Sequence, residues 1–299
     1  MGQGLKCEVG MKMTYNEIVE RWKNKNIHTT EDLKQSLSSY KIIFAYNSGV
    51  IENEEITYHN TREIFENGKV VNFSGNLRTI YEIENQKKCF DFLIEKIIEK
   101  ESITESLILD IHKKLTQGTY DEERWKKGER SGKFKVNDYC VADEQGALPE
   151  EVPGEIAELC EELCDIPDRG ENIIRAAAYL HCKFENIHPF ADGNGRVGRT
   201  LMNYFLMTHN YPPLVVYNDT KDKYYEALGH YDKTGDVIPF TQYMKESLEK
   251  TWERKAVPEQ KLNSMLQETS EENEIQQGKV SMERKQEILQ EMKGINLVE

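Results

Sequence analysis

Apolar residues recur at steps of three and four along most of the chain, a spacing that places them on one face of an α-helix. Glycine or proline stands at several of the breaks between these runs, where helices commonly end. The pattern therefore predicts a mostly helical protein, with helices over residues 15–22, 33–51, 80–98, 103–115, 156–163 and 240–252.

One segment departs from the helical spacing. Residues 131–142, Ser-Gly-Lys-Phe-Lys-Val-Asn-Asp-Tyr-Cys-Val-Ala, have the pattern of a pair of β-strands. The predicted fold class is therefore all-α, a helical bundle with a single β-hairpin.

Residues 188–199, His-Pro-Phe-Ala-Asp-Gly-Asn-Gly-Arg-Val-Gly-Arg, concentrate groups that suit a polyphosphate. Gly193 and Gly195 let the backbone approach an anion closely and permit positive φ. A helix is predicted over residues 196–208, and its N-terminal amides and positive dipole end face the same place. Phe190 is expected to lie buried beneath the loop. The backbone of this segment thus predicts an anion site.

The side chains of the same segment add charge and a base. Asn194 is a neutral donor, while Arg196 and Arg199 lie one helical turn apart and can bind successive phosphates. Asp192 can hold Mg²⁺ that bridges two phosphates, because Mg²⁺ typically binds one or two carboxylates plus substrate oxygens. His188 can take a proton from a nucleophile near neutral pH. These groups indicate an enzyme that acts on a nucleotide.

Each of these residues alone is common in turns or on solvated faces, but together they form a specific pattern. His-x-Phe-x-Asp-Gly-Asn-Gly-Arg-x-x-Arg resembles the active-site signature of the Fic family, with every signature position filled. The resemblance covers about residues 79–251, with a helical approach over 176–187. Within residues 221–228, Tyr224 and Tyr225 resemble the family's segment beside the nucleotide base.

The resemblance implies a protein adenylyltransferase, which transfers AMP from ATP to a Ser, Thr or Tyr hydroxyl of a target protein with Mg²⁺. In that reaction His188 deprotonates the hydroxyl, and Asp192 holds Mg²⁺ on the leaving pyrophosphate. Asn194 and the glycine amides hold the α- and β-phosphates. Arg196 binds the leaving group and Arg199 reaches the γ-phosphate.

A second motif lies upstream. Ser48-Gly-Val-Ile-Glu52-Asn53 fits the Ser/Thr-x-x-x-Glu-Gly/Asn pattern of the inhibitory helix found in many Fic proteins, and it places that helix at about residues 40–55. The resemblance implies that Glu52 pairs with Arg199 and stops ATP from binding productively. A solvated Ser and Glu pair on an ordinary amphipathic helix is the alternative.

The family also implies a role for the predicted hairpin, as a flap that aligns the target peptide by strand addition. The residues expected to dock the target are Lys133, Phe134, Lys135 and Val136. Lys135 stands where relatives often carry arginine, which leaves the contacts of the flap open. A surface hairpin without a substrate role is the alternative.

Other functions compete with AMP transfer. His181, Glu185 and His188 fall on one helical face beside Cys182, a stripe that could bind a transition metal, although Pro189 ends regular helix there. Fic-like proteins also transfer UMP, phosphocholine or a bare phosphate. A nucleotide-sensing interaction module with little turnover is a third possibility.

Composition narrows the partners and the location. A net charge of −14 argues against nucleic acid or an anionic membrane surface as the main partner. No apolar stretch has the length of a membrane span, and the N-terminus lacks the apolar core of a secretion signal. The six cysteines include no Cys-x-x-Cys pair and are expected to be reduced. We therefore expect a cytoplasmic protein.

The chain is predicted to have three regions. They are an N-terminal helical region with the inhibitory helix at 1–78, a Fic core domain at 79–252 and a charged helical extension at 253–299. The extension contains two charged stretches, residues 259–274 and 279–293, and no aromatic residue. Self-modification and a homodimer are expected from the resemblance.

Overall fold

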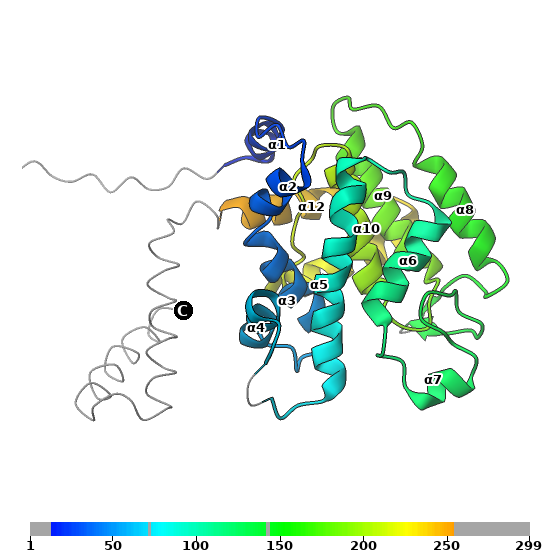
Figure 1. The fold of residues 1–299 in the computed structure, drawn as a ribbon. Coiled ribbons are helices and arrows are strands. Elements are labelled where there is room, and N and C mark those ends of the chain that lie inside the picture. Colours follow the sequence, from blue (N-terminus) through cyan, green and yellow to red (C-terminus); the bar gives the residue numbers. More distant parts are fainter. Residues whose placement is uncertain (1–12, 71–72, 142–143, 254–299) are drawn as a thin grey trace, which may run out of the picture. The chain divides into compact units, whose positions relative to one another are not determined.

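The computed structural model describes residues 13–70, 73–141 and 144–253 (Figure 1). The chain divides into two compact units, Met1–Thr251 and Trp252–Glu299, and only the first two residues of the second unit are described. The charged stretches 259–274 and 279–293 lie outside the described residues. The three-region division stays a prediction.

Helices account for nearly all regular structure in the described residues, so the all-α prediction is confirmed. None of them is both long enough and apolar enough to cross a membrane. In chain order they are α1 Tyr15–Lys23, α2 Thr30–Ser36, α3 Tyr40–Val50, α4 Tyr58–Asn67, α5 Leu77–Ile98, α6 Glu105–Thr116, α7 Glu122–Lys126, α8 Val152–Glu162, α9 Asn172–Ile187, α10 Asn194–Thr208, the 3₁₀ helix η1 Asn218–Thr220, α11 Lys221–Thr234 and α12 Ile238–Glu253.

The helix predicted over residues 33–51 is wrong in one respect, because the structure breaks it into α2 and α3. Leu37 is the C-cap residue of α2, and its backbone angles are not helical. Ser39 is the N-cap residue of α3. The break escapes the hydrophobic pattern because Leu37 and Tyr40 on either side of it are both buried. The other five predicted helices correspond to α1, α5, α6, α8 and α12.

The predicted hairpin is present only as a short antiparallel pair. Strand β1 is Cys140–Val141 and strand β2 is Glu144–Gln145, with Cys140 opposite Gln145 and Val141 opposite Glu144.

Residues 131–139, predicted as strand, form turns and irregular chain instead. The cause is the buried carboxylate of Glu129, which accepts from the backbone N–H groups of Val136 at 3.2 Å and Asn137 at 3.1 Å. Those amides are therefore not available to a strand partner, and the strands lie instead at the end of the predicted segment (β1) and just beyond it (β2).

Helix α10 is the centre of the first unit and packs against α3, α5, α6 and α9 (Figure 1). Thirteen of its fifteen residues are buried, which is the pattern of a helix surrounded by protein on all sides. Charged side chains on such a helix have to be paired, because an isolated buried charge is strongly destabilising. Arg196 and Arg199, the two buried arginines near the start of α10, therefore need acidic partners from neighbouring elements.

Candidate active site

The loop between α9 and α10 has a backbone that few residues adopt. α9 ends at His188, whose φ of 51° is left-handed and costs energy for a residue other than glycine. Gly193, with φ of 87°, begins α10. Phe190 between them is fully buried, as predicted, and stacks on the ring of His112 with centroids 3.7 Å apart. The loop thus has a fixed shape that sets the direction of His188.

Asn194 fixes the same loop from within. Its side-chain Nδ2 donates to the carbonyl oxygen of Phe190 at 2.7 Å, and its Oδ1 accepts from the Phe190 N–H at 2.9 Å. Both ends of the amide are therefore occupied by Phe190. Asn194 shapes the loop in this structure, and a phosphate contact from its side chain stays a prediction.

Arg199 is held by the upstream motif. Its Nε donates to the Ser48 hydroxyl at 3.1 Å, and its Nη2 donates both to the Ser48 carbonyl at 2.9 Å and to Glu52 Oε1 at 2.8 Å. Burial of Arg199 works against its charge, but Glu52, Tyr224 and Glu185 together outweigh burial and raise the pKa of the guanidinium. The structure therefore contains the pair that the two motifs predict.

Glu52 also occupies the start of α10. Its Oε1 lies so close to Gly195 that a Cβ at this position would clash with it, and with Arg199 Nη1 at 2.8 Å. A carboxylate is stabilised there by the unpaired N–H groups and the positive dipole end of the helix. Glu52 is one-third exposed, so solvent and solutes reach it. An internal anion thus sits in the predicted anion site.

Asp192 lies in a second cluster of charges. Arg78 Nη2 donates to its Oδ2 at 2.6 Å and Arg196 Nη2 donates to its Oδ1 at 3.2 Å, while Arg124 Nη2 lies 3.9 Å away. Burial opposes ionisation of Asp192, but Arg196, Arg78 and Arg124 together hold the pKa of the carboxyl below its usual value. Asp192 is therefore ionised at neutral pH.

The buried carboxylate of Glu82 connects this cluster to the upstream motif. It accepts from Arg78 Nε at 3.0 Å and Arg196 Nη1 at 3.2 Å. Its other oxygen accepts from Asn53 Nδ2 at 2.8 Å. Consecutive residues of the upstream motif therefore contact the two arginine clusters, Glu52 at Arg199 and Asn53 at Glu82.

His188 lies between segments that bind its backbone neighbours. The Lys135 N–H donates to the Pro189 carbonyl at 2.9 Å, and the Ala147 N–H donates to the Ile187 carbonyl at 3.1 Å. Burial, and then the nearby charge of Lys135, lower the pKa of His188 to about 4. The imidazole is therefore neutral at pH 7, the form that accepts a proton.

The four predicted docking residues face different ways. Lys133 and Val136 are exposed, whereas Lys135 is buried. Phe134 stacks on Phe190, with centroids 5.7 Å apart. Only Lys133 and Val136 present an exposed side chain to a target, so a docking role for all four stays a prediction.

The two tyrosines predicted beside the nucleotide base, Tyr224 and Tyr225, differ in their exposure to solvent. Tyr224 is fully buried and its hydroxyl shares a hydrogen bond of 2.8 Å with His181 Nε2. Tyr225 is half exposed, and its ring meets that of Tyr224 edge-on with centroids 5.1 Å apart. Only Tyr225 offers exposed side-chain surface in this structure, and contact of the two tyrosines with a nucleotide base stays a prediction.

The stripe proposed as a transition-metal site is not assembled. His181 Nε2 lies 4.0 Å from Glu185 and is bonded to Tyr224. Over the part of the chain that the structure describes, no group of three or more His, Cys, Asp or Glu residues could hold a metal ion. The single carboxylate of Asp192 suits Mg²⁺ bound together with phosphates, because Mg²⁺ keeps few protein ligands.

Several site residues were missed from sequence. Arg78 and Glu82 stand one turn apart on α5, and Arg124 lies on the short helix α7. An Arg and Glu pair at this spacing is common on solvated helix faces, so only its burial reveals a role. His112, in α6, is likewise a single histidine in an apolar run.

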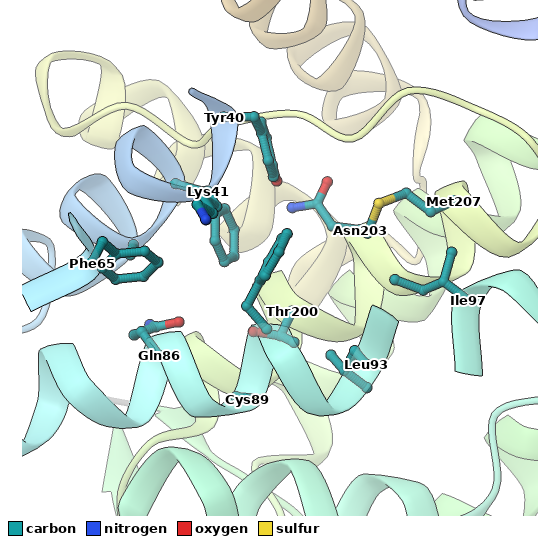
Figure 2. Close-up of a pocket in the computed structure, with 13 residues that line it drawn as sticks. Tyr40, Lys41, Phe65, Gln86, Cys89, Leu93, Ile97, Thr200, Asn203 and Met207 are labelled. Atoms are coloured by element: carbon teal, nitrogen blue, oxygen red, sulfur yellow. The ribbon is translucent and has the colours of Figure 1, made fainter. Parts of the chain in front are cut away.

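An apolar cavity between α3, α5 and α10 is separate from this site (Figure 2). Its lining includes neither the 188–199 loop nor the 48–53 motif. The lining residues labelled in Figure 2 are Tyr40, Lys41, Phe65, Gln86, Cys89, Leu93, Ile97, Thr200, Asn203 and Met207.

Two curated proteins resemble most of the chain. "Protein adenylyltransferase fic-1" of Caenorhabditis briggsae is 28% identical over 229 residues, 76% of this chain and 43% of that protein. "Protein adenylyltransferase Fic" of Drosophila persimilis is 30% identical over 238 residues, 77% of this chain and 44% of that protein. The chain spans less than half the length of these relatives.

Solved structures resemble the fold as well. A Fic domain containing signaling protein from Bacteroides thetaiotaomicron superposes with a TM-score of 0.69 at 25% identity, covering 79% of this chain and 93% of that one. Fic-1 from C. elegans gives a TM-score of 0.64 at 25% identity, covering 80% of this chain and 68% of that one. The model of the Fic/DOC family matches residues 102–206, which include the whole 188–199 loop. On this evidence the chain belongs to the Fic/DOC family.

Proposed function

We propose that this protein transfers AMP from ATP to a Ser, Thr or Tyr hydroxyl of a protein. The observation that carries the proposal is the carboxylate of Glu52, which lies over Gly195 at the start of α10 and pairs with Arg199. A site that stabilises an internal anion in this way also suits a phosphate. The names of the relatives, protein adenylyltransferases, support the same reaction.

The chemistry assigned to the chain's own residues is a proton transfer and an in-line substitution. His188 takes the proton of the attacking hydroxyl, whose oxygen forms a bond to the α-phosphorus of ATP. The bond from that phosphorus to the bridging oxygen breaks, and pyrophosphate leaves. The Gly195 amide and the guanidinium groups of Arg196 and Arg199 stabilise the phosphate charge.

Asp192 is the residue proposed to hold Mg²⁺. Bound there with ATP, the metal would neutralise charge on the leaving pyrophosphate. A metal at Asp192 would compete with Arg78 and Arg196, each of which donates to one oxygen of the carboxylate, and would loosen these contacts. Those guanidiniums then become available to phosphate.

We also propose that the arrangement is autoinhibited. Glu52 neutralises Arg199, and its carboxylate takes the place of a phosphate at Gly195. Ser48 holds the same guanidinium in place through its hydroxyl and carbonyl. Transfer by the unmodified chain should therefore be slow until Glu52 is displaced.

The test is transfer from α-labelled ATP and Mg²⁺ onto protein, with intact mass as a second readout. Glu52→Gly is expected to label itself or a protein in a lysate by the mass of AMP, and the unmodified chain far less. Glu52→Gly combined with His188→Ala should lose the transfer while keeping its fold. Labelling that survives the loss of His188 contradicts the assigned base.

Donor identity is resolved in the same assay. UTP and CDP-choline replace ATP in parallel reactions, and transfer from either in preference to ATP contradicts AMP transfer. Binding of ATP by Glu52→Gly without transfer to any protein favours a nucleotide-sensing module. We further propose that the protein modifies itself, forms a homodimer and is located in the cytoplasm.

A further inference from the structure

His112 lies outside the 188–199 loop in sequence but directly against it in space. It comes from α6 and is fully buried. Its ring is nearly parallel to that of Phe190, with an interplanar angle of 8° and centroids 3.7 Å apart. The loop that carries His188 and Asp192 therefore rests on this imidazole.

The hydrogen bonds of His112 define which nitrogen carries the proton. The Gly132 N–H donates to Nδ1 at 2.9 Å, so Nδ1 has no hydrogen. In the neutral ring the proton is then on Nε2, which lies 3.1 Å from the Asp192 carbonyl oxygen and donates to it. Burial lowers the pKa of His112 to about 3, in agreement with a neutral ring.

The ring thus joins two segments that meet at the site. One is the segment from Gly132 to Lys135: the Gly132 N–H donates to His112, and the Lys135 N–H donates to the Pro189 carbonyl. Asp192 is the carboxylate proposed to hold Mg²⁺, and its backbone is fixed by His112 with help from the Tyr120 hydroxyl at 3.4 Å.

We propose that His112 is a positioning residue for the reaction, a neutral imidazole whose hydrogen bond to the Asp192 backbone sets where the metal-binding carboxylate lies. The inference rests on the proposed function for the identity of the reaction. It predicts an effect on metal affinity, because groups that orient a metal ligand typically change affinity or activity by about 10- to 100-fold when they are lost.

The test separates the ring from its hydrogen bonds. His112→Phe keeps a flat ring against Phe190 but loses every hydrogen bond of the imidazole, including those to Gly132 and to the Asp192 carbonyl, which loses its main donor. The probe is Mn²⁺ in the presence of a non-hydrolysable ATP analogue, measured by electron paramagnetic resonance in the Glu52→Gly background. His112→Phe is expected to raise the Mn²⁺ dissociation constant about tenfold or more.

A matched control is His209→Phe. His209 also packs against a phenylalanine, with centroids 4.2 Å from Phe205, and bonds a backbone carbonyl at 2.8 Å, but it lies at the end of α10 away from the loop. It is expected to leave Mn²⁺ affinity within twofold of the parent. An equal loss in both variants overturns the assignment to His112.

Two amide variants keep the inference testable if His112→Phe does not fold. His112→Gln places an amide donor toward Asp192, whereas His112→Asn places its amide nearer Gly132. The inference predicts tighter Mn²⁺ binding in the Gln variant than in the Asn variant, and equal or reversed affinities overturn it.

The outcome is separable from that of the proposed function. If the Glu52→Gly parent binds Mn²⁺ with the analogue but transfers no AMP, the reaction is wrong while the His112 result still stands on binding alone. If the parent transfers AMP and His112→Phe binds Mn²⁺ as the parent does, the positioning role is wrong.

Discussion

Arg78 donates to Asp192 at 2.6 Å, so the carboxylate proposed for Mg²⁺ is held by a guanidinium in this structure. The same arginine contacts Glu82, which accepts from Asn53 of the upstream motif. A change in the position of that motif can therefore reach Asp192 through a chain of direct contacts. The autoinhibition that we propose would act on the metal site as well as on Arg199.

Replacing Arg78 tests this competition. Arg78→Gln in the Glu52→Gly background should bind Mn²⁺ with the ATP analogue about three- to tenfold more tightly, because a charge-assisted hydrogen bond no longer competes for Asp192. Titration by electron paramagnetic resonance measures the change. Arg62→Gln is the control, since Arg62 pairs with Glu66 on α4 at 3.0 Å, the same distance as between Arg78 and Glu82. Weaker or unchanged binding in Arg78→Gln contradicts a competing role.

Ser48 should contribute to inhibition in a graded way. Ser48→Ala removes the hydroxyl that accepts from Arg199 Nε, but it leaves the Ser48 carbonyl and Glu52 in place. One buried hydrogen bond is worth about 1 kcal/mol, so we expect AMP transfer to rise about fivefold, well below the gain from Glu52→Gly. Initial rates with α-labelled ATP measure it.

Ser39→Ala is the control for Ser48. Ser39 precedes the same helix, is exposed and makes no capping hydrogen bond through its side chain. A rate gain of equal size in Ser39→Ala, or a gain in Ser48→Ala that matches Glu52→Gly, contradicts the assigned contact.

The pairing of Glu52 with Arg199 was accessible from sequence, and the network around Asp192 was not. The first involves two short motifs that resemble those of the Fic family, and the resemblance implied the role of each residue before its position was known. Arg78 is far from Asp192 in sequence, and its contact depends on how α5 packs against α10. Tertiary packing of this kind leaves no periodic signal.

The fold shows the same division. Long amphipathic helices such as α5 follow from the hydrophobic pattern, whereas the flap does not. Its strand pattern was overridden by Glu129, a single buried carboxylate that accepts from the Val136 and Asn137 amides. Tyr224 and Tyr225 are neighbours in sequence, yet helix geometry turns one inward and leaves the other half exposed.

Glu185 should make stability depend on pH. Burial raises its pKa to about 8, with Glu52 and Asp232 adding to the shift, while Arg199 opposes it. The folded state therefore holds a proton that the unfolded state has lost above about pH 4.5, so the free energy of unfolding falls as pH rises toward 8. The slope from one such group is about 1.4 kcal/mol per pH unit.

Glu185→Gln cannot ionise and should lose this dependence. Its stability relative to the parent is expected to increase from pH 5.5 to pH 8.5, measured by urea unfolding at each pH. Glu158→Gln, at an exposed position on α8, is the control and should show no such trend. A difference between Glu185→Gln and the parent that stays constant with pH contradicts a buried protonated carboxyl.

His188 is expected to work as a base at unusually low pH. Burial and then Lys135 lower its pKa from 6.5 to about 4, and the neutral ring is the form that takes the proton. The acid limb of kcat/KM for Glu52→Gly should therefore lie well below pH 6.5. Lys135→Met removes a nearby positive charge, so it should move the limb upward toward 6.5. Lys133→Met, two residues away and exposed, should leave it in place. A limb near 6.5 before any lysine is changed, or a downward shift in Lys135→Met, contradicts the effect assigned to burial and to Lys135.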